Sequence, residues 1–591
     1  MGVPGASWLI APVGTHPQFT GAAFTDEDRL YAKTAGDFVT NEVLPRLEEI
    51  EAKAEGLMPA LLRRAGELGL LMIDIPAEYG GLALKKTTSM LVSEHSALCA
   101  SFSVSLGAHT GIGTLPIVYY GNEAQKRKYL PRLGTGELLA AYALTEPGSG
   151  SDALGAKTRA ERDPAGGYRL TGTKQFITNA GFADLFTVFA KVDGDKFTAF
   201  LVERGTPGLS TGPEEKKLGI RGSSTRQLLL DDVHVPDEAV LGEIGQGHKI
   251  AFNILNIGRF KLGAGSLGAA KDCLAFALDY ARQRTQFGKP IATFGMIQRK
   301  LADMATRIYV ADSMSYRTAG LMDAAAEAIP ADAPDHQKRL VRESVEEYTI
   351  EASILKVFGT ETLDFVADEA LQILGGYGFT AEYPVERHYR DSRVNRIFEG
   401  TNEINRLIIP ATLVKRIGQG ALPFMEFLQQ VEREIARPDV WPRAAGTPLD
   451  REIRAAEVAK RVVGYVASIL IQRQLASLKD KQQHLEILAN MIIEVFAMDS
   501  VVNRTRLLMG HGSPEADELR RAMTNVFVAS ANGRVVNDAR RLLANEFEGE
   551  ELRQHLRLET IIPKFPIRTI AVKTRIAEAL VAHGLGPVFL R

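Results

Sequence analysis

The chain has 591 residues, enough for about four domains at ~150 residues each. Hydrophobic residues make up 45% and charged residues 24%, and the formal net charge of −2 gives no basic footprint that would indicate nucleic acid as a partner. Cys99 and Cys273 lie far apart, so they predict neither a disulfide framework nor a metal site and fit a reducing cytosol. No apolar run reaches ~18 residues, and no signal-peptide order is seen. We expect a cytoplasmic protein, at most peripheral to the inner face of a membrane.

The residue pattern changes along the chain from one typical of helices to one typical of β-strands, and then back to one typical of helices. We predict an α+β fold with an N-terminal helical domain, a central β-barrel or sandwich domain, a second helical bundle and an all-helical C-terminal extension. Glycine, proline and serine near the start predict a loose arm, and a later cluster of prolines predicts a linker. The predicted parts are an arm over 1–24, helices over 25–138, the β domain over 139–246, the second helical domain over 247–418, the linker over 419–450 and the C-terminal helices over 451–591.

In chain order, Thr25 caps a first helix with an acidic first turn, and its apolar pattern continues to Ile50. Further helices are predicted over 57–69, 87–106 and 111–120. Short β runs separated by turn residues follow at 141–145, 168–172, 174–179, 185–190, 197–202, 226–230 and 233–236. Helix returns near Gly247 and continues to Ile417, with a loop over 323–334.

One glycine motif needs its context before it is interpreted. Gly263–Gly268 fits the pattern G-x-G-x-x-G, which indicates a dinucleotide site only between a strand and a helix. It lies inside the long amphipathic run 250–282. We therefore interpret these glycines as small residues for close helix packing.

The C-terminal region is predicted to form four helices over 451–478, 484–508, 515–543 and 550–558. Val462–Ile471 is strongly apolar but far too short to span a bilayer. A packed core or a subunit contact is the first interpretation. Basic residues flank the run, so a role at a membrane surface stays open.

A single carboxylate stands out in Arg396–Glu403 (RIFEGTNE). Glu399 follows two apolar residues, so partial desolvation should raise its pKa and suit a general base near neutral pH. Gly400 allows close approach of the backbone to a ligand. Thr401 and Asn402 can cap the helix that follows, whose N–H groups could bind a diphosphate.

Three stretches together with this one resemble the acyl-CoA dehydrogenase family. They are Ala143–Asp152 (ALTEPGSGSD), Arg282–Pro290 (RQRTQFGKP) with Leu301–Met304 (LADM), and Gln372–Phe379 (QILGGYGF), which precedes the pair Arg390 and Asp391. Each is moderately specific alone, and their order and spacing are strongly so. The resemblance covers about 25–417. The C-terminal extension narrows it to the very-long-chain type, a homodimer with a fourth domain.

The resemblance implies α,β-desaturation of a fatty acyl-CoA to the trans-2-enoyl-CoA, as in fatty acid β-oxidation. The α-proton goes to a base, which carries over to Glu399, and the β-hydride goes to flavin N5, because no side chain accepts a hydride. The backbone N–H of Glu399 and a flavin hydroxyl would polarise the thioester carbonyl. The implied cofactor is FAD, and the implied electron acceptor is electron-transfer flavoprotein.

The family's FAD contacts carry over to five segments of this chain. Phe176 stands where the family has tryptophan, which keeps an aromatic face but loses the indole N–H. Arg284 resembles the arginine that pairs with the FAD diphosphate across the dimer interface. The expected cofactor residues are Tyr142, Leu144, Thr145, Gly150, Ser151, Phe176, Ile177, Thr178, Arg284, Phe287, Gln372, Ile373, Gly375, Gly376, Thr401, Asn402 and Glu403.

The expected substrate contacts are Ser151, Asn256, Gly258, Arg259, Phe398, Glu399 and Gly400. The branched-chain and long-chain types keep their base one residue before the arginine that matches Arg259, and here that position is Gly258, so Glu399 is the one candidate base. Ser101 and Ser103 fall where the very-long-chain type has glycines, while Phe102 could obstruct the pocket. We favour a long straight-chain acyl-CoA.

Other interpretations stay open. Arg284 could make a plain salt bridge at a helix end, Arg259 could pair with a helix carboxylate, and Phe176 and Phe398 could be core aromatics. Arg390 and Asp391 suggest a structural ion pair. A flavin oxidase that uses oxygen, or a respiratory assembly factor that keeps the fold, would share this sequence pattern.

Overall fold

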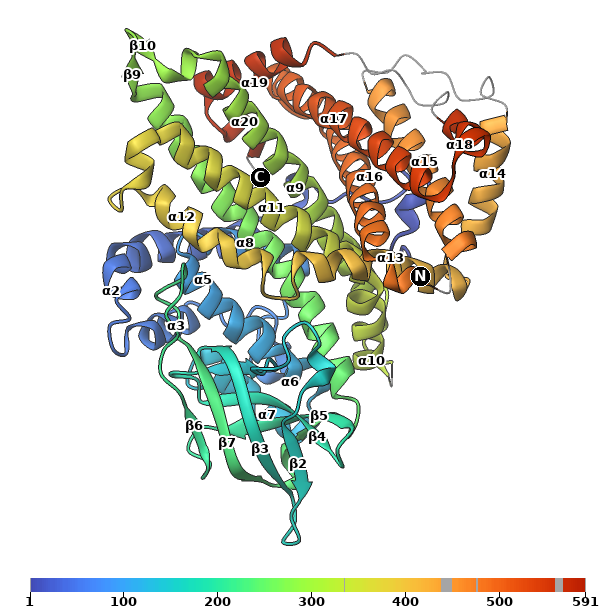
Figure 1. Ribbon diagram of the computed structural model, residues 1–591. Helices are drawn as coiled ribbons and strands as arrows, with labels where there is room; N and C mark the ends of the chain where they lie inside the picture. The colour runs from blue at the N-terminus through green and yellow to red at the C-terminus, as the bar shows by residue number, and fades with distance from the viewer. Residues whose placement is uncertain (1, 334, 437–448, 475–476, 559–566, 590–591) are drawn as a thin grey trace.

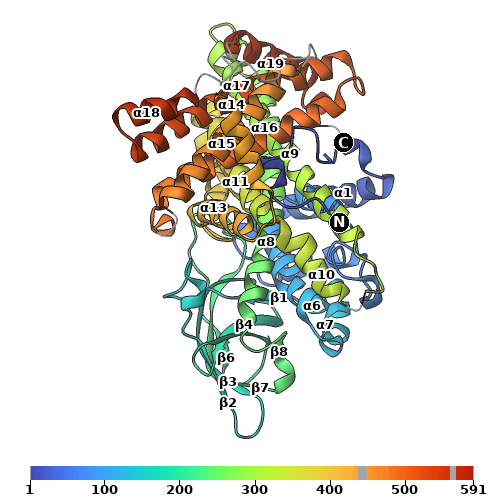
Figure 2. The same ribbon diagram turned by 90° about the vertical axis from the view of Figure 1, so that its right-hand side faces the viewer.

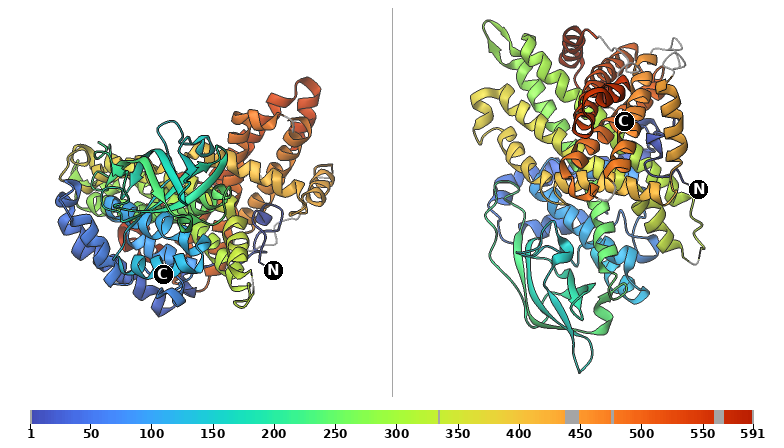
Figure 3. Two further views of the ribbon diagram at one scale, coloured as in Figure 1. Left: turned by 90° about the horizontal axis from the view of Figure 1, so that it is seen from below. Right: turned by 45° about the vertical axis from the view of Figure 1, so that its right-hand side comes forward.

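The computed structural model describes residues 2–333, 335–436, 449–474, 477–558 and 567–589. The sheet lies at one end of the molecule and the helical parts lie above it (Figures 1 and 2). The orange and red C-terminal helices lie on the side of the second helical domain away from the sheet (Figure 3). The predicted order of helical, β, helical and C-terminal helical parts is confirmed.

The N-terminal helical domain begins where the sequence predicted. The Thr25 hydroxyl accepts from the Asp28 N–H, and the Asp28 carboxylate accepts from the Thr25 N–H, which forms a capping box. The single helix predicted over 87–106 is instead two helices. The helices of this domain are α1 (Asp26–Phe38), α2 (Leu47–Glu51), α3 (Leu57–Glu67), α4 (Lys86–His95), α5 (Ala100–Gly107), α6 (Leu115–Tyr120) and α7 (Glu123–Thr135).

The β domain is one eight-stranded sheet in the order β6-β7-β3-β2-β4-β5-β8, with β1 paired in parallel to β4. The two halves of this path join where β2 pairs with β4 over two residues, and side chains from β3, β7, β4 and β5 share one hydrophobic core. The long pair β3 and β7 is antiparallel and carries irregularities in register. The strands are β1 (Ala140–Ala143), β2 (Arg159–Arg162), β3 (Tyr168–Thr178), β4 (Leu185–Val192), β5 (Lys196–Glu203), β6 (Leu209–Thr211), β7 (Thr225–Val235) and β8 (Val240–Leu241).

The second helical domain is built on three long helices. The short hairpin β9 (Thr285–Gln286) and β10 (Lys289–Pro290) connects the first two. Gly263 packs against Gly359, and a Cβ at Gly268 would lie 2.1 Å from the Glu94 carbonyl oxygen. The glycine motif is therefore a close helix contact, as predicted. The helices are α8 (Gly247–Gln283), α9 (Gly295–Glu327), α10 (His336–Leu340), α11 (Thr349–Leu374), α12 (Pro384–Ser392) and α13 (Asn402–Gly418).

The C-terminal domain contains the four predicted helices and a later one that the sequence pattern did not show. That helix, α19, packs on α17 and returns to α9, where Lys573 pairs with Asp303 at 2.7 Å. Most of the predicted linker after α14 lies outside the described residues. The helices are α14 (Phe424–Ala436), α15 (Asp450–Gln474), α16 (Gln482–Leu508), α17 (Pro514–Glu546), α18 (Gly549–Leu556), α19 (Thr569–His583) and α20 (Gly586–Phe589).

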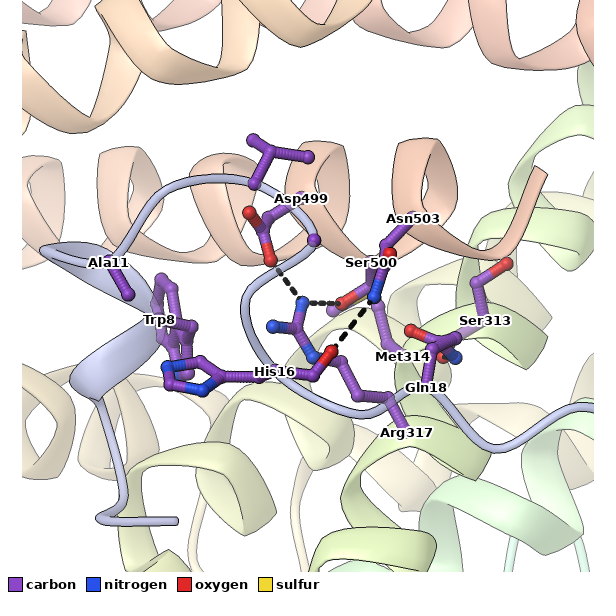
Figure 4. A network of polar contacts seen from close by, with 12 residues as sticks. Trp8, Ala11, His16, Gln18, Ser313, Met314, Arg317, Asp499, Ser500 and Asn503 are labelled. Atoms are coloured by element: carbon purple, nitrogen blue, oxygen red, sulfur yellow. Dashed lines mark hydrogen bonds and ion pairs between the residues drawn. The ribbon is translucent and has the colours of Figure 1, made fainter. Parts of the chain in front are cut away.

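The N-terminal arm is packed, which corrects the prediction of a loose segment. Trp8 is buried, its indole N–H donates to Glu351 on α11 at 2.8 Å, and its ring lies 4.7 Å from that of Phe496 on α16. The His16 carbonyl oxygen accepts from Asn503 at 3.1 Å. Figure 4 shows the arm between α9 and α16. The arm thus joins the second helical domain to the C-terminal domain.

Across the described ranges, every helix is too short or too polar to cross a bilayer. The apolar run Val462–Ile471 belongs to α15, and eight of its ten residues are buried. It is therefore a packed core helix, the first of the two predicted roles.

Candidate active site

A pocket opens beside Glu399 between the first two helical domains. One wall is α8, and the opposite wall comes from α4, α5 and the turn that follows α5. The wall on α8 extends from Gly258, next to Glu399, to Ala269 three turns further along. Phe398 and Thr178 also line the pocket, so Phe398 is not a core aromatic. The site therefore combines the carboxylate of Glu399 with a long cavity, whose lining also includes Asp74 and Asp391.

Glu399 lies in a strained turn. Its φ is +57° and that of Gly400 is +77°, so two successive residues adopt the left-handed conformation. The Glu399 Oε2 is fully enclosed and has no hydrogen-bond partner among the described residues. Burial raises the pKa of Glu399 to about 7, although Arg259 and Lys356 act in the opposite direction. The predicted rise of this pKa is confirmed, and the value suits a general base near neutral pH.

Three side chains hold the backbone of this turn. Arg259 donates its Nε to the Glu399 carbonyl oxygen at 3.1 Å and its Nη1 to Asn256 Oδ1 at 2.8 Å. Asn405 and Lys356 each donate to the Gly400 carbonyl oxygen at 2.8 Å. Arg259 is buried and bonds to a backbone carbonyl, so the alternative of a helix ion pair is wrong. Its expected contact with the CoA portion stays a prediction.

Gly258 makes room for the carboxylate. A Cβ added there would lie 2.5 Å from Glu399 Oε2. The space that a side chain at position 258 would occupy is thus filled by the carboxylate of Glu399.

Gly258→Ala is therefore expected to displace the Glu399 carboxylate and lower kcat about 10²-fold, the effect of misplacing a reacting group by about 1 Å. Steady-state kinetics with an acyl-CoA measure this. Gly265→Ala is the matched control, because it adds the same methyl group to the same helix where a Cβ meets nothing within 4 Å. Equal losses in the two variants would contradict the steric argument.

The loop after β1 is fixed by a buried ion pair that sequence reasoning missed. Glu146 binds Lys174 Nζ at 2.7 Å and accepts from the Thr158 N–H at 3.0 Å. The Thr145 carbonyl oxygen accepts from the Gln175 N–H at 2.8 Å. Tyr142 and Leu144 are buried at the start of this loop, whereas Gly150 and Ser151 are exposed at its tip.

Phe176 and Ile177 on β3 lie beside this loop but face different environments. Phe176 is 61% exposed with φ +57°, so it is not a core aromatic, while Ile177 is buried in the sheet. Thr178 follows them and reaches the pocket lining. The exposed ring of Phe176 is thus free to contact a ligand at the edge of the pocket.

A second group of the expected cofactor residues lies on another face. The Arg284 guanidinium stacks 5.6 Å from the Tyr377 ring and makes no ion pair among the described residues, so the plain salt bridge is not seen. Phe287 is 93% exposed in the hairpin after α8. Gln372, Gly375 and Gly376 are exposed at the end of α11, and Ile373 is buried beneath them. The Arg284 segment and the glycine turn are therefore neighbours, and both stand apart from the pocket lining.

The start of α13 is capped by its own side chain. The Thr401 hydroxyl accepts from the Ile404 N–H, as predicted, whereas Asn402 turns inward to Lys356 and Thr360. Glu403 is exposed in the first turn. Asn402 is thus a structural contact of the turn, and its contact with a cofactor stays a prediction.

Several other sequence expectations need correction. Arg390 pairs with Glu386 at 2.8 Å, and Asp391 accepts from the Ile220 N–H, so the two are not paired with each other. Ser103 lines the pocket, but Ser101 bonds to Glu51 on the other side. Phe102 is fully buried against Phe38 and does not obstruct the pocket.

The backbone offers space for a dinucleotide at both loops. A Cβ at Gly148 or Gly150 after β1, or at Gly375 or Gly376 after α11, would meet no atom within 4 Å. Backbone groups there can approach a ligand closely. Together with the exposed Phe176 ring and the unpaired Arg284, these residues fit FAD.

Family models describe almost the whole chain. Models of the acyl-CoA dehydrogenase N-terminal, middle and C-terminal domains match residues 25–137, 141–233 and 245–414, and a further acyl-CoA dehydrogenase C-terminal domain model matches 458–559.

Similar proteins have the same architecture. A "probable acyl-CoA dehydrogenase" of Bacillus subtilis is 47% identical over 578 residues, which is 97% of each chain. The human mitochondrial very long-chain specific acyl-CoA dehydrogenase is 38% identical over 76% of this chain and 70% of its own. A crystal structure of an acyl-CoA dehydrogenase complexed with FAD from Bacillus anthracis superposes with a TM-score of 0.96 at 45% identity, covering 98% of this chain and 99% of that one.

These comparisons, together with a pocket lined by the Glu399 carboxylate, identify a flavin-dependent oxidoreductase of the dehydrogenase type. The chain belongs to the acyl-CoA dehydrogenase family and has the additional C-terminal domain. The predicted family, fold and enzyme class are confirmed.

Proposed function

We propose that the protein dehydrogenates a long straight-chain fatty acyl-CoA to the trans-2-enoyl-CoA, with Glu399 as the base. The observation that carries this proposal is the Glu399 carboxylate, which lines a long cavity, has its Oε2 enclosed and has its pKa raised to about 7. A single poised base suits removal of one α-proton. A carboxylate can remove a proton from carbon only where a neighbouring group acidifies it, as a thioester acidifies its α-carbon. An acyl thioester whose tail lies in the cavity therefore fits this site.

The residues divide the work of the reaction. The α-carbon–hydrogen bond breaks and its proton passes to the Glu399 carboxylate, while the β-carbon loses a hydride and the double bond forms between the two carbons. FAD, when bound, supplies the hydride acceptor. The Glu399 N–H has no acceptor among the described residues and could donate to the thioester carbonyl. Arg259 and Asn405 hold the turn in place meanwhile.

FAD would be held at both glycine loops. Thr145, Ser151, Phe176 and Thr178 would meet the flavin half, and the α11 turn with the α13 N-terminus would meet the remainder. Phe287, Met296, Tyr377 and Phe379 are exposed around Arg284. So large an apolar surface favours a homodimer in which Arg284 reaches the FAD of the second copy.

Pocket length supports a long acyl chain. From Gly258 to Ala269 the lined face of α8 extends about 16 Å at 1.5 Å per residue. The two serines of α4 that line the pocket have partners for their hydroxyls: Ser93 donates to the Ser89 carbonyl oxygen at 2.8 Å, and Ser89 donates to Asp74 at 3.1 Å. Lys261 on the wall is paired with Asp74 at 2.5 Å. The wall is thus compatible with methylene groups well beyond a four-carbon chain.

The test is an anaerobic titration of the FAD-loaded protein with butyryl-, octanoyl- and palmitoyl-CoA, following the visible flavin absorbance. We expect palmitoyl-CoA to bleach the flavin fastest. Ala269→Leu narrows the far end of the pocket, so it should lower the rate with palmitoyl-CoA about tenfold or more and leave butyryl-CoA nearly unchanged. General damage would lower all three rates equally. No bleaching by any acyl-CoA would exclude the proposal.

Electron transfer onward is proposed to go to electron-transfer flavoprotein, in the cytoplasm, in fatty acid β-oxidation. Adding that protein to the reaction should restore the flavin absorbance and sustain turnover. Stoichiometric peroxide release in air would instead favour the oxidase interpretation. Binding to the inner face of a membrane remains an additional proposal, tested by sedimentation with anionic vesicles.

A further inference from the structure

A buried lysine lies against the catalytic turn from the opposite side to Arg259. Lys356 on α11 is fully buried. Its Nζ donates to the Gly400 carbonyl oxygen at 2.8 Å and to Asn402 Oδ1 at 2.7 Å. Burying an ammonium group is costly unless it is hydrogen-bonded and its charge is compensated. Three carboxylates attract this ammonium group: that of Glu399, one residue before Gly400, has the largest effect, and Glu403 and Glu361 have smaller ones.

The contacts of Lys356 fix Gly400 and Asn402, the first and third residues after the base. Asn402 is held on its other side by Thr360 and by Glu361 at 3.0 Å. The Gly400 carbonyl oxygen receives Lys356 and Asn405 together. Because Glu399 and Gly400 are both left-handed, the turn depends on such contacts to persist.

We propose that Lys356 is a positioning residue of the reaction, which holds the Glu399–Asn402 turn through its two hydrogen bonds and provides the positive charge that favours the ionised form of the Glu399 carboxylate. The inference rests on the proposed role of Glu399 as the base. Lys356 does not line the pocket. It therefore acts through Glu399 and not on the substrate.

Lys356 and Glu399 shift each other's pKa. Burial lowers the pKa of Lys356 to about 7, against the attraction of Glu399, and Lys356 in turn lowers the pKa of Glu399. The two groups therefore titrate as a coupled pair. The other titratable groups that face them are Arg259 from α8, Glu361 from α11, Glu403 and Arg406 from α13, and Tyr142 from β1.

Lys356→Met removes the cation and keeps a side chain of similar length. The pKa of Glu399 should then rise, so the acid limb of kcat/KM moves to higher pH. A shift of one unit lowers kcat/KM about tenfold near pH 6 and has little effect above pH 8. The dissociation constant for acyl-CoA should stay unchanged, because Lys356 does not touch the pocket. Lys356→Arg keeps the positive charge, so the acid limb of kcat/KM should stay at the pH of the wild type.

The control is Lys460→Met, which removes another buried ammonium, bonded at 2.6 Å to the Ala11 carbonyl oxygen in the C-terminal domain. It should lower the thermal midpoint without moving the limb. Lys356→Met with lower kcat but an unmoved limb would overturn the proposal and leave Lys356 a structural residue. If Lys356→Met does not fold, the acid limbs of Lys356→Arg and Lys356→Gln are compared instead. Only Lys356→Gln loses the charge, so only its limb should move to higher pH. Activity that survives in Glu399→Gln would instead remove the proposed base, a separate failure.

Discussion

Glu399→Gln is expected to lower kcat/KM for acyl-CoA by about 10²–10⁴-fold, the usual contribution of a general base. The amide keeps the size of the side chain, so the space above Gly258 stays filled. FAD binding and acyl-CoA binding should be retained. Anaerobic stopped-flow reduction of the flavin measures the effect directly.

The pH dependence of the wild type follows from the same carboxyl group. Because the pKa of Glu399 is raised to about 7, kcat/KM should fall about tenfold per pH unit below that value and reach a plateau above it. An acid limb near pH 4.5 would mean that the carboxylate is solvated when substrate arrives.

Stability provides the folding control for this variant. The pKa of Glu399 is higher in the fold than in an unfolded chain, so ionising the enclosed carboxylate costs stability at pH 8 and costs nothing below about pH 4. Glu399→Gln removes that cost. Its thermal midpoint at pH 8 should therefore equal or exceed that of the wild type, and a large decrease would attribute the lost activity to misfolding.

The sequence predicted those parts of the site in which chemistry depends on neighbours in the chain. The apolar residues before Glu399 predicted its desolvation, and Thr25 and Thr401 predicted helix starts, because caps act over three residues. The glycine motif lies in the middle of α8, and its packing against Gly359 and Glu94 agrees with the predicted close helix contact. The family motifs supplied the domain order and FAD.

Long-range contacts could not be predicted in this way. Lys356 lies on a helix more than forty residues before the turn that it holds. In the sequence it looks like any other polar residue of that helix. The arm has the glycine and proline content of a loose segment. Trp8 is nevertheless buried, because the fold brings it against Glu351, which lies over 340 residues away in the chain. Only the tertiary structure brings such partners together.

A buried charge cluster fastens the arm and the C-terminal domain to the second helical domain. Asp499 on α16 binds Arg317 on α9, and its other oxygen lies 2.6 Å from Lys460 on α15. Lys460 also donates to the Ala11 carbonyl oxygen of the arm. Burial opposes ionisation of Asp499, but Lys460 and Arg317 outweigh it and hold the pKa of Asp499 below its usual value. All three charged side chains are buried.

Asp499→Ala is therefore expected to lower the free energy of unfolding by about 3–5 kcal/mol, because it leaves two buried cations without their counter-charge. Urea unfolding at pH 7 with FAD in excess measures this. In the wild type, the stability from the depressed pKa is fully present above about pH 4 and is lost as pH falls through the folded value. The difference between the two proteins should thus shrink in acid.

Asp37→Ala is the matched control, because Asp37 pairs with Lys33 in an exposed ion pair on α1. Its loss should cost about 0.2–1 kcal/mol at most. If Asp499→Ala costs no more than this, the buried cluster is replaceable, and the packing of Trp8 against Phe496 must hold the arm instead. If it costs the full amount and also exposes the arm to proteolysis, the cluster is the contact that joins the arm, α9 and the C-terminal domain into one body.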